Sequence, residues 1–551
     1  MFKNLQSIDL GIIVMYFVLI FGVALYVYLR RKRQTKGSAT EGYFLGGKDL
    51  SWIVVGASLF ASNIGSEHLI GLAGQGASGD FVAGQFELLA SLILLLLGWF
   101  FVPFYLRSGV FTMPGFLARR YDQWAKSYLS WVSIVAYVIT KISVTIIAGG
   151  IVVTALLGIN FWVGAVIIVL FTGIYTIIGG LKVVVLTDAV QMVILLAGSI
   201  GLTYFGLQEL GGWDALVSVT TPEHLSLWRG IDDPDFPWTG ILFGAPILGV
   251  WYWCTDQFIV QRVISAKNLD HARKGTIFGG FLKLLPLFLF VLPGVIAFAL
   301  SQSPDASFEF PVVNGKVQYD QALPLLTLNI LPAGMKGLVI AGILAALMSS
   351  LSSVFNSCST LFTMDIYRKY KPDATPKRLV YVGQIATVVL VGLGLAWIPL
   401  MELIEGGLFQ KLQSIQAYIS PPIAAVFLIG IFSRKITSKA AKYSLLTGAV
   451  LGTSRLVLEL VQQSLKAKGS SLPSILASIT EINFLHFAVV LFVICTVVLL
   501  VTSKEKDAKP LREIESITYS KKVNVGTSEP LNLALSIILV ICVVALWVIF
   551  R

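Results

Sequence analysis

Polar residues interrupt a long apolar stretch near residue 65, where the sequence reads Ala61-Ser-Asn-Ile-Gly-Ser-Glu-His68. Gly65 lowers helix propensity by about 1 kcal/mol, and the neighbouring Ser and Asn side chains compete for backbone hydrogen bonds. An unwound turn at this point would free backbone carbonyl oxygens, which are hard ligands suited to a cation such as sodium. A polar helix kink satisfied by neighbouring helices explains the same residues equally well, so both interpretations stay open.

A second group of oxygen-bearing side chains lies in the run Ser-Ser-Leu-Ser-Ser at residues 349–353. Ser349, Ser352 and Ser353 are spaced i, i+3 and i+4, so their hydroxyls share one helix face. Serines on such a face often serve only to permit close helix packing. Asp188, in another apolar segment, offers a carboxylate that needs a cation partner, and this favours a cation site near the serines.

Three further apolar segments each carry an isolated polar residue, namely Glu87, Lys283 and Gln413. An ionisable group within a membrane span is costly unless it is paired or lines a wet cavity. Glu87 and Lys283 have opposite charges and could neutralise one another across a cavity, although each could also be a structural hydrogen-bonding residue. Together with His68 they offer the donors and acceptors that a solute with several hydroxyls needs once it is desolvated.

The elements that must hold these residues are apolar helices. Of the 551 residues, 56% are hydrophobic and only 13% are charged, which is about half the charged share of a soluble chain. This composition excludes a soluble multidomain enzyme. About 20 apolar residues are needed to cross a bilayer as a helix. Fourteen segments meet this requirement: 8–29, 51–74, 81–106, 128–156, 161–178, 184–208, 239–262, 275–301, 334–364, 379–400, 408–432, 441–460, 485–503 and 531–550.

The basic residues predict the orientation of these spans. The chain has 41 Lys and Arg against 30 Asp and Glu, and 30 of the 41 fall in one of the two alternating sets of loops, with the adjoining helix ends. That set comprises 30–50, 107–127, 179–183, 263–274, 365–378, 433–440 and 504–530. By the positive-inside rule this set is cytoplasmic and both termini face outward. The basic excess is therefore an orientation signal and does not indicate nucleic-acid binding.

Helix breakers in two predicted spans indicate an internal repeat. Gly65 lies in span 51–74, and Pro246 lies in span 239–262, where it removes a backbone hydrogen bond. The two broken spans lie five spans apart, and since five is odd, two tandem five-helix units have opposite membrane orientations. The predicted organisation is an extra helix with a basic linker (1–50), a first repeat (51–210), an outer loop (211–238), a second repeat (239–432) and three C-terminal helices (433–551) with a cytoplasmic linker at 504–530.

Other functions find little support in the sequence. The run from Gly42 to Lys48 approaches a phosphate-binding loop, but Asp49 replaces the required Ser or Thr and a basic linker precedes it. No catalytic motif is present, so neither catalytic residues nor a cofactor other than a coupling ion are predicted. The four cysteines lie inside predicted spans, which favours buried hydrophobes over disulfides or zinc ligands: Cys254, Cys358, Cys495 and Cys542.

Four motifs resemble the sodium/solute symporter family, and most of all its sodium–glucose and sodium–inositol cotransporter branch. They are Gly-Ser-Glu-His-Leu-Ile-Gly-Leu-Ala-Gly (65–74), Trp-Tyr-Trp-Cys-Thr-Asp-Gln (251–257), Ser-Ser-Leu-Ser-Ser (349–353) and Phe-Thr-Met-Asp-Ile-Tyr (362–367). The resemblance implies an all-α integral membrane protein with a leucine-transporter-type inverted repeat of 5+5 helices. Spans two to eleven would form that core, with one extra helix before it and three after it.

The resemblance also implies roles for individual residues. It places sodium on the backbone carbonyls of Ala61, Ile64 and Ala346 with the hydroxyls of Ser349 and Ser350, and a possible second sodium on Asp188, Ser349, Ser352 and Ser353. It assigns substrate binding to His68, Glu87, Lys283, Gln413 and Tyr252. It assigns the gates to Leu72, Phe86, Phe409 and Tyr252. Gly249 and the run 88–90 differ from sugar-transporting relatives by having less hydrogen-bonding capacity.

The expected function is sodium-coupled symport of a sugar or polyol, such as a hexose or inositol, across the plasma (inner) membrane. One charge crossing 100 mV contributes about 2.3 kcal/mol, and a tenfold sodium gradient adds about 1.4 kcal/mol. One sodium thus supports roughly 10²–10³-fold accumulation, and two would square that ratio; two are expected. Symport of another solute (sialic acid, a monocarboxylate or an amino acid) is an alternative, which Glu87 mildly opposes for carboxylates. A membrane sensor or channel on the same scaffold is another, although linker 504–530 is short for a signalling domain.

Overall fold

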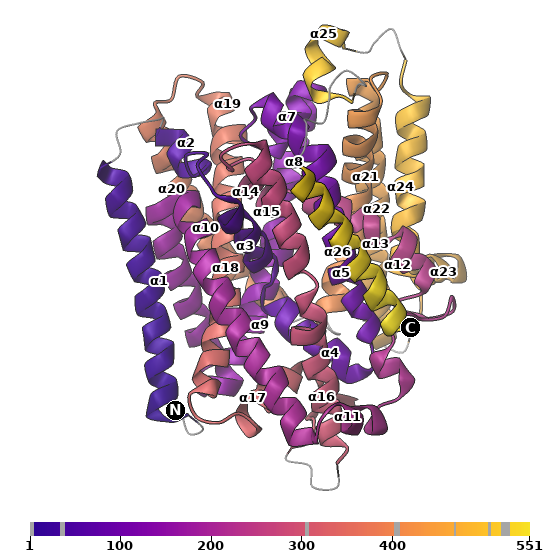
Figure 1. Cartoon of the computed structure of the whole chain (residues 1–551). Helices are drawn as coiled ribbons and strands as arrows, with labels where there is room; N and C mark the ends of the chain where they lie inside the picture. Colours follow the sequence, from indigo (N-terminus) through magenta and orange to yellow (C-terminus); the bar gives the residue numbers. More distant parts are fainter. Residues whose placement is uncertain are drawn as a thin grey trace.

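The computed structural model describes residues 5–33, 39–303, 308–313, 315–401, 408–467, 470–504, 509–519 and 529–551. Helices form almost all of it (Figure 1). Through residue 263 the α-helices are α1 (Ser7–Arg33), α2 (Ala39–Phe44), α3 (Trp52–Asn63), α4 (Ser66–Ser78), α5 (Gln85–Leu96), α6 (Val102–Ser108), α7 (Met113–Arg120), α8 (Gln123–Ala136), α9 (Ser143–Leu157), α10 (Phe161–Leu210), α11 (Trp213–Val219), α12 (Trp238–Phe243), α13 (Ala245–Gly249) and α14 (Gln257–Val263). They are followed by α15 (Leu269–Leu282), α16 (Leu292–Ser301), α17 (Ala322–Asn329), α18 (Met335–Leu361), α19 (Arg368–Tyr370), α20 (Pro376–Met401), α21 (Leu408–Phe432), α22 (Ser438–Ala467), α23 (Ser474–Glu481), α24 (Phe484–Val501), α25 (Leu511–Ile514) and α26 (Pro530–Ile549).

Shorter segments connect these helices or continue them. Five are π-helical turns: η2 (Leu97–Phe101), η3 (Tyr137–Ile142), η5 (Val250–Thr255), η6 (Leu287–Val291) and η8 (Phe362–Tyr367). Four are short 3₁₀ turns: η1 (Phe81–Gly84), η4 (Pro222–Leu225), η7 (Tyr319–Gln321) and η10 (Glu515–Ile517). One antiparallel hairpin pairs β1 (Val312–Val313) with β2 (Lys316–Val317). The π-helical turns lie within longer helical runs, where such irregularities often mark functional positions.

Eleven helices of the described chain are long and apolar enough to cross a membrane, or twelve if the bent pair α3–α4 counts as one span. The sequence predicts fourteen spans. With the bent pair counted as one span, the difference of two comes from two places in the chain. Helix α10 runs for 50 residues and covers both predicted spans 161–178 and 184–208 around a kink at Gly180. The predicted span 239–262 is divided into α12, α13, η5 and α14, none of which is long enough alone.

Gly180 shows why the kink in α10 requires glycine. Its φ of 62° lies in the left-handed region, and a Cβ atom there would approach the Tyr43 carbonyl oxygen to 2.5 Å. Residues with a side chain rarely adopt this conformation, whereas glycine does so without steric cost. Gly180 therefore divides α10 into two halves that correspond to the predicted spans 161–178 and 184–208, although the helix is nearly continuous through the kink.

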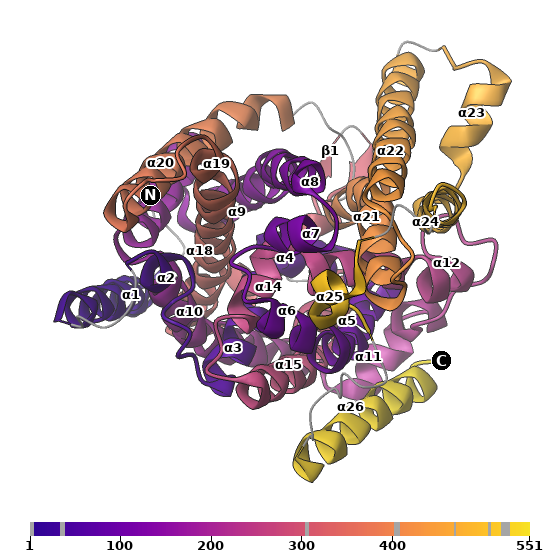
Figure 2. The same cartoon turned by 90° about the horizontal axis from the view of Figure 1, so that it is seen from above.

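Among the long apolar helices, α18 lies in the most buried candidate span; it packs against α10 over most of its length and also contacts α1, α3 and α20. Seen from above, α1, α22, α24 and α26 lie at the periphery (Figure 2). Both chain ends lie in the lower half of Figure 1, opposite α2, α7, α19 and α25. Following the predicted topology, we call the end with α2, α7 and α19 the inner end, and the opposite end the outer end.

The last helix is tied to the outer end of the bundle. The Phe550 carbonyl accepts a hydrogen bond from the Leu227 amide at 2.8 Å, and the Trp547 indole donates to the side chain of Gln85 at 2.6 Å. The Trp228 indole in turn donates to the Trp547 carbonyl at 3.2 Å. Helix α26 therefore holds the loop that begins at residue 226, although about three hundred residues separate them in the chain.

Helices α4 and α16 cross so closely that only glycine fits between them. A Cβ atom on Gly294 would lie 1.9 Å from the Ala73 carbonyl oxygen, while one on Gly392 in α20 would have no heavy atom within 4 Å. Gly294→Ala is therefore expected to destabilise the protein by about 1–3 kcal/mol, because backbone atoms must separate. Gly392→Ala, the matched control, is expected to be neutral or stabilising by up to about 1 kcal/mol. Thermal unfolding of both variants in detergent checks this; equal melting temperatures would contradict the described crossing.

Candidate functional site

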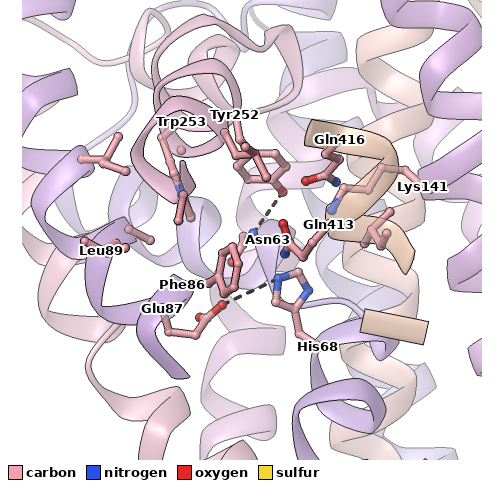
Figure 3. Close-up of a pocket in the computed structure, with 16 residues that line it drawn as sticks. Asn63, His68, Phe86, Glu87, Leu89, Lys141, Tyr252, Trp253, Gln413 and Gln416 are labelled. Carbon is pink, nitrogen blue, oxygen red and sulfur yellow. Dashed lines mark hydrogen bonds and ion pairs between the residues drawn. The ribbon is translucent and has the colours of Figure 1, made fainter. Parts of the chain in front are cut away.

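A small cavity lies between the broken helix pair α3–α4 and helices α5, η5 and α21 (Figure 3). Its free volume of about 50 Å³ holds only a few water molecules. Four of the five predicted substrate-binding residues line it: His68, Glu87, Tyr252 and Gln413. Gly249, Leu89 and Ala90, at positions that the sequence analysis marks as poor in hydrogen-bonding groups, also line it.

The fifth predicted residue, Lys283, lies behind the cavity wall and not on it. Its ammonium group donates hydrogen bonds to the carboxylate of Glu87 and to the side-chain oxygen of Asn63. Both Lys283 and Glu87 are almost completely buried, and the His68 ring nitrogen lies 3.8 Å from the other Glu87 oxygen. The predicted neutralisation of Glu87 by Lys283 is therefore present, and Glu87 presents a polarised carboxylate to the cavity.

Asn63, which the sequence analysis assigns no role, connects the cavity to its inner wall. Its oxygen accepts from Lys283, and its amide nitrogen donates to the Tyr252 hydroxyl at 3.0 Å. The Tyr252 ring lies between the cavity and the inner end, and the Lys141 ammonium lies 4.9 Å from its centroid. The position of Asn63 beside the predicted helix break could have indicated a functional role. The sequence alone could not show that its side chain bridges Lys283 and Tyr252.

Aromatic rings close the outer side of the cavity. Phe86 and Phe409 pack edge to face with centroids 5.7 Å apart, and Phe409 packs in the same way against His68 at 6.0 Å. Phe86 lines the cavity, whereas Phe409 is completely buried and does not line it, so their role as the outer gate stays a prediction. Leu72, the third predicted gate residue, is completely buried in α4 and does not line the cavity.

A third outer ring, Phe236, was not predicted. It is completely buried, and its centroid lies 6.1 Å from that of Phe86. The preceding residue, Asp235, accepts a hydrogen bond from Gln410 at 2.5 Å, directly beside Phe409. Burial raises the pKa of the Asp235 carboxyl, while the hydrogen bond from Gln410 lowers it. Asn483, the N-cap of α24, holds the same loop through the carbonyls of Pro234 and Asp235. Asp235 and Phe236 lie in a loop whose sequence has no helix or strand pattern. Only the tertiary structure therefore shows that they lie beside Gln410 and Phe86.

The predicted break between α3 and α4 is present and bends the chain by 59°. The Gly65 amide donates to the Asn63 carbonyl and the His68 amide to the Gly65 carbonyl, so neither reaches the acceptor it would have in a continuous helix. Those acceptors are the carbonyls of Ala61 and Ile64, which are released from the helix ladder as predicted for sodium ligands. Ser350 on α18 lies beside them, since its hydroxyl donates to the Ser62 carbonyl at 3.1 Å.

The predicted ligands of a second sodium surround an arginine. Asp188 accepts from Ser349 and Ser58, each at 2.6 Å, and its second oxygen lies 3.4 Å from a guanidinium nitrogen of Arg262. Arg262 also donates to the Ser353 hydroxyl, whereas the Ser352 hydroxyl bonds to the Ser349 carbonyl of its own helix. The cation partner that Asp188 needs is thus supplied by the protein.

Arg262 corrects the sequence interpretation. It is counted there among the basic residues at cytoplasmic helix ends, yet its side chain is completely buried, as is that of Asp188. Helix α14 begins deep in the protein at the Asp256 cap, so that the last turn, which carries Arg262, still faces α18. The predicted span 239–262 treats this segment as one straight helix, which would place Arg262 at the membrane surface.

The geometry of the site suits oxygen ligands of a light cation. Within the described ranges, no three His, Cys, Asp or Glu side chains converge as a transition-metal site would require. A family model for the sodium:solute symporters matches residues 43–448. The chain belongs to the sodium:solute symporter family. It is therefore a sodium-coupled symporter, and its long apolar helices make it a multi-pass membrane protein.

Similar proteins within this family are cotransporters by name. The chain is 40% identical over 531 residues to sodium/glucose cotransporter 1 of Ovis aries, which covers 90% of this chain and 78% of that protein. It is 34% identical over 559 residues to the sodium/myo-inositol cotransporter of Homo sapiens, with 95% and 77% covered. The symporter assignment made from sequence motifs is confirmed.

Solved structures support the fold. A sodium-coupled sialic acid symporter in a substrate-bound, outward-open state aligns with a TM-score of 0.75 at 22% identity, covering 90% of this chain and 98% of that one. A nucleobase-cation-symport-1 family transporter in a closed conformation aligns with a TM-score of 0.50 at 14% identity, covering 88% and 99%. The predicted all-helical transporter fold is thus shared with known cation-coupled transporters.

The buried ion pair of Asp188 and Arg262 is expected to contribute to the stability of the protein. Arg262→Met is expected to destabilise the protein by about 3–5 kcal/mol, because it leaves a carboxylate buried without its cation. The double variant Asp188→Asn/Arg262→Met is expected to recover most of this loss. Thermal unfolding followed by tryptophan fluorescence measures both. Arg378→Met, on an exposed residue, is the control and is expected to change stability by less than about 0.5 kcal/mol.

Failure of the double variant to recover stability would show that Arg262 acts mainly through Ser353, Ser58 and the Phe258 carbonyl and not through the charge of Asp188.

Proposed function

We propose that this protein couples the entry of sodium to the uptake of a hexose or inositol by alternating access. The observation that carries the proposal is the small cavity lined by Glu87, whose carboxylate is paired with Lys283 behind the wall. This cavity lies between two aromatic barriers and beside a helix break with released carbonyls. The names of the relatives, a sodium/glucose and a sodium/myo-inositol cotransporter, support this substrate class.

The chemistry of the cavity suits a neutral polyol. Glu87 accepts hydrogen bonds from hydroxyls, Gln413 and Asn63 both donate and accept, and charge-assisted bonds of this kind are the stronger ones. Phe86, Tyr252 and Trp253 cover apolar sugar faces. A carboxylate substrate would meet Glu87 directly, and the like charges would repel. This favours a sugar or inositol over a sialic acid or a monocarboxylate.

The two barriers correspond to the gates of alternating access. On the outer side, Phe86, Phe409 and Phe236 pack together, and on the inner side the Tyr252 hydroxyl is held by Asn63. From these two barriers we infer an arrangement close to the occluded state of the proposed cycle. Admission of a solute requires the phenylalanines to part, and its release inward requires Tyr252 to leave Asn63.

Sodium would act through the helix break. The proposed first site uses the carbonyls of Ala61, Ile64 and Ala346 with the hydroxyls of Ser349 and Ser350, so it joins α3–α4 to α18. Asn63 lies between two of these carbonyls and holds both Lys283 and Tyr252. A cation that fixes the broken turn therefore also fixes Asn63, which couples the ion to the solute cavity and to the inner barrier.

A second sodium is proposed at Asp188, with Ser349, Ser352 and Ser353. Arg262 bears on this site, because a sodium ion and a guanidinium both close to one buried carboxylate repel each other strongly. Sodium binding there requires Arg262 to move away from Asp188. Helix α14 carries Arg262 and directly follows η5 with Tyr252, so such a movement would also act on the inner barrier.

The proposed topology has fourteen crossings, with the halves of α10 counted separately and the segment from α12 to α14 as one broken span. The two inverted repeats would be 51–210 and 239–432, with 1–50 and 433–551 as additions. The basic loops would face the cytoplasm and both termini the outside of the plasma (inner) membrane. The clustering of α2, α7, α19 and α25 at one end and of both termini toward the other supports this arrangement (Figure 1).

Uptake into proteoliposomes tests the proposed substrate class. Purified protein is expected to accumulate a hexose or an inositol from a labelled panel under an inward sodium gradient, and not under a potassium gradient. Gln413→Ala is expected to weaken the apparent substrate affinity by about 2- to 10-fold, as the loss of one hydrogen bond requires. Gln208→Ala makes the same change on an exposed face and serves as control. If no member of the panel accumulates, the proposed substrate class is wrong.

The number of coupled sodium ions has its own test. Simultaneous measurement of current and labelled substrate is expected to give two charges per neutral substrate molecule. Asp188→Asn removes the charge of the proposed second site and is expected to lower this ratio toward one. A ratio of one in the wild type would exclude the second sodium and leave Arg262 as the permanent partner of Asp188.

A further inference from the structure

The motif Phe-Thr-Met-Asp-Ile-Tyr at 362–367 contains a buried carboxylate that the proposed transport cycle does not yet use. The motif forms the π-helical turn η8 at the inner end of α18, and Asp365 in it is only 3% exposed. A carboxylate kept in such a place needs compensating donors. Its donors all come from elements other than α18.

Three side chains surround the Asp365 carboxylate. The Thr112 hydroxyl donates to one oxygen at 2.9 Å, and the Lys126 ammonium contacts the same oxygen at 3.0 Å. The Ser130 hydroxyl lies 3.4 Å from the other oxygen. Lys126 and Ser130 belong to α8, whereas Thr112 belongs to the loop before α7. Asp365 thus fixes this loop to the frame formed by α8 and α18.

The same loop is held from its other side by Gln257, the first residue of α14. The Gln257 side-chain oxygen accepts from the Met113 amide at 2.8 Å, and its nitrogen donates to the Phe111 carbonyl at 3.3 Å. Thr112 meanwhile caps α7 by accepting from the Gly115 amide at 3.0 Å. The loop 111–113 is therefore clasped between Asp365 on one side and Gln257 on the other, and all of these residues except Phe111 are buried.

Gln257 is joined to the inner barrier through the chain itself. It follows Tyr252 by five residues, across η5 and the Asp256 cap, whose side chain accepts from the Phe258 amide at 3.1 Å. A displacement of this short segment large enough to take Tyr252 from Asn63 pulls Gln257 from a loop that Asp365 holds in place. Two hydrogen bonds to the loop backbone then break.

We propose that Asp365, Thr112 and Gln257 form an inner latch, in which Asp365 is a positioning residue that holds loop 111–113 so that Gln257 keeps the Tyr252 segment closed. This inference rests on the proposed alternating-access function, because it assigns the latch to the inner barrier of that cycle. The latch lies on the inner side of Tyr252 and contacts neither the cavity nor the proposed sodium ligands. It therefore sets how readily the inner side opens and leaves solute recognition to the cavity.

A reporter for inner opening already exists in the chain. Cys254 lies two residues after Tyr252 and is completely buried, so its thiol reacts only when this segment opens. The other three cysteines are replaced by serine or alanine to leave Cys254 alone. Reaction with N-ethylmaleimide in detergent, with the protein in sodium-containing buffer and no sugar, then measures the open fraction of the inner side.

Thr112→Val keeps the size of the side chain and removes the hydrogen bond to Asp365. It is expected to accelerate labelling of Cys254 by about tenfold, the effect of one lost bond to a charged acceptor. Asp365→Asn is expected to act in the same direction. Asp270→Asn changes another Asp–Lys pair, Asp270 with Lys274 at 2.8 Å. The Asp270 carboxylate also accepts from Asn532 on α26 and is not part of the latch, so this control is expected to leave labelling unchanged. Unchanged labelling in Thr112→Val would overturn the latch.

Two further measurements separate a latch from loss of fold and from failure of the transport proposal. Thr112→Val also removes the cap of α7, which costs about 1 kcal/mol, so its melting temperature is expected to fall by only a few degrees. If Asp365→Asn does not fold, Thr112→Val and Gln257→Leu carry the test. Because labelling requires no sugar, accelerated labelling supports the latch even if no sugar in the panel is transported. Where uptake is observed, the latch predicts a changed maximal rate with cavity affinity unchanged within about twofold, and a change confined to affinity would contradict it.

Discussion

A membrane-spanning helix tolerates a break only where the released backbone groups find partners, because the hydrocarbon around it supplies none. The break between α3 and α4 releases the carbonyls of Ala61 and Ile64, and the surrounding architecture follows from that requirement. Helix α18 must pass close by with hydroxyls, and glycines must let α16 approach α4. Helix α18, which carries these hydroxyls, is buried along almost its whole length beside the break. The carbonyls of Ala61 and Ile64 and the hydroxyls on α18 together offer uncharged oxygen atoms, which suit an alkali cation.

Four charged residues near the centre of the bundle form two separate ion pairs. Glu87 and Lys283 neutralise each other at the cavity, and Asn63 connects that pair with the inner barrier. Asp188 and Arg262 neutralise each other farther inward, between α10 and α14. Each pair joins helices that the proposed alternating-access cycle would move relative to one another, so that cycle would change the partners of a buried charge. The energetic cost of such changes is large in a low dielectric, and this makes tight coupling between ion and solute physically reasonable.

Much of this arrangement could be predicted from the sequence, because the residues concerned are polar exceptions in apolar segments. The helix break at Gly65 and the pairing of Glu87 with Lys283 follow from residue type and span, whereas a gate role for Phe86 and Phe409 is implied only by the family resemblance. The rest depends on distances between segments far apart in the chain. Arg262 was assigned to the membrane surface since a straight helix was assumed, and Phe236 lies in an irregular loop. Asn63 could be placed at the break, but the direction of its side chain could not. The local sequence pattern thus predicts which polar side chains are buried, whereas the tertiary packing determines which of them contact one another.

The hydrogen bonds from α26 to the loop at Leu227 and Trp228 give the end of the chain an influence on the outer barrier. That loop continues directly into the segment with Asp235 and Phe236, which covers Phe86. In the proposed cycle this segment borders the outer entrance, so a polypeptide joined after Arg551, such as an affinity tag or a fluorescent protein, would start close to that entrance. Crowding at that entrance would slow the proposed entry of solute, so the position of a fusion is part of the design of any transport assay.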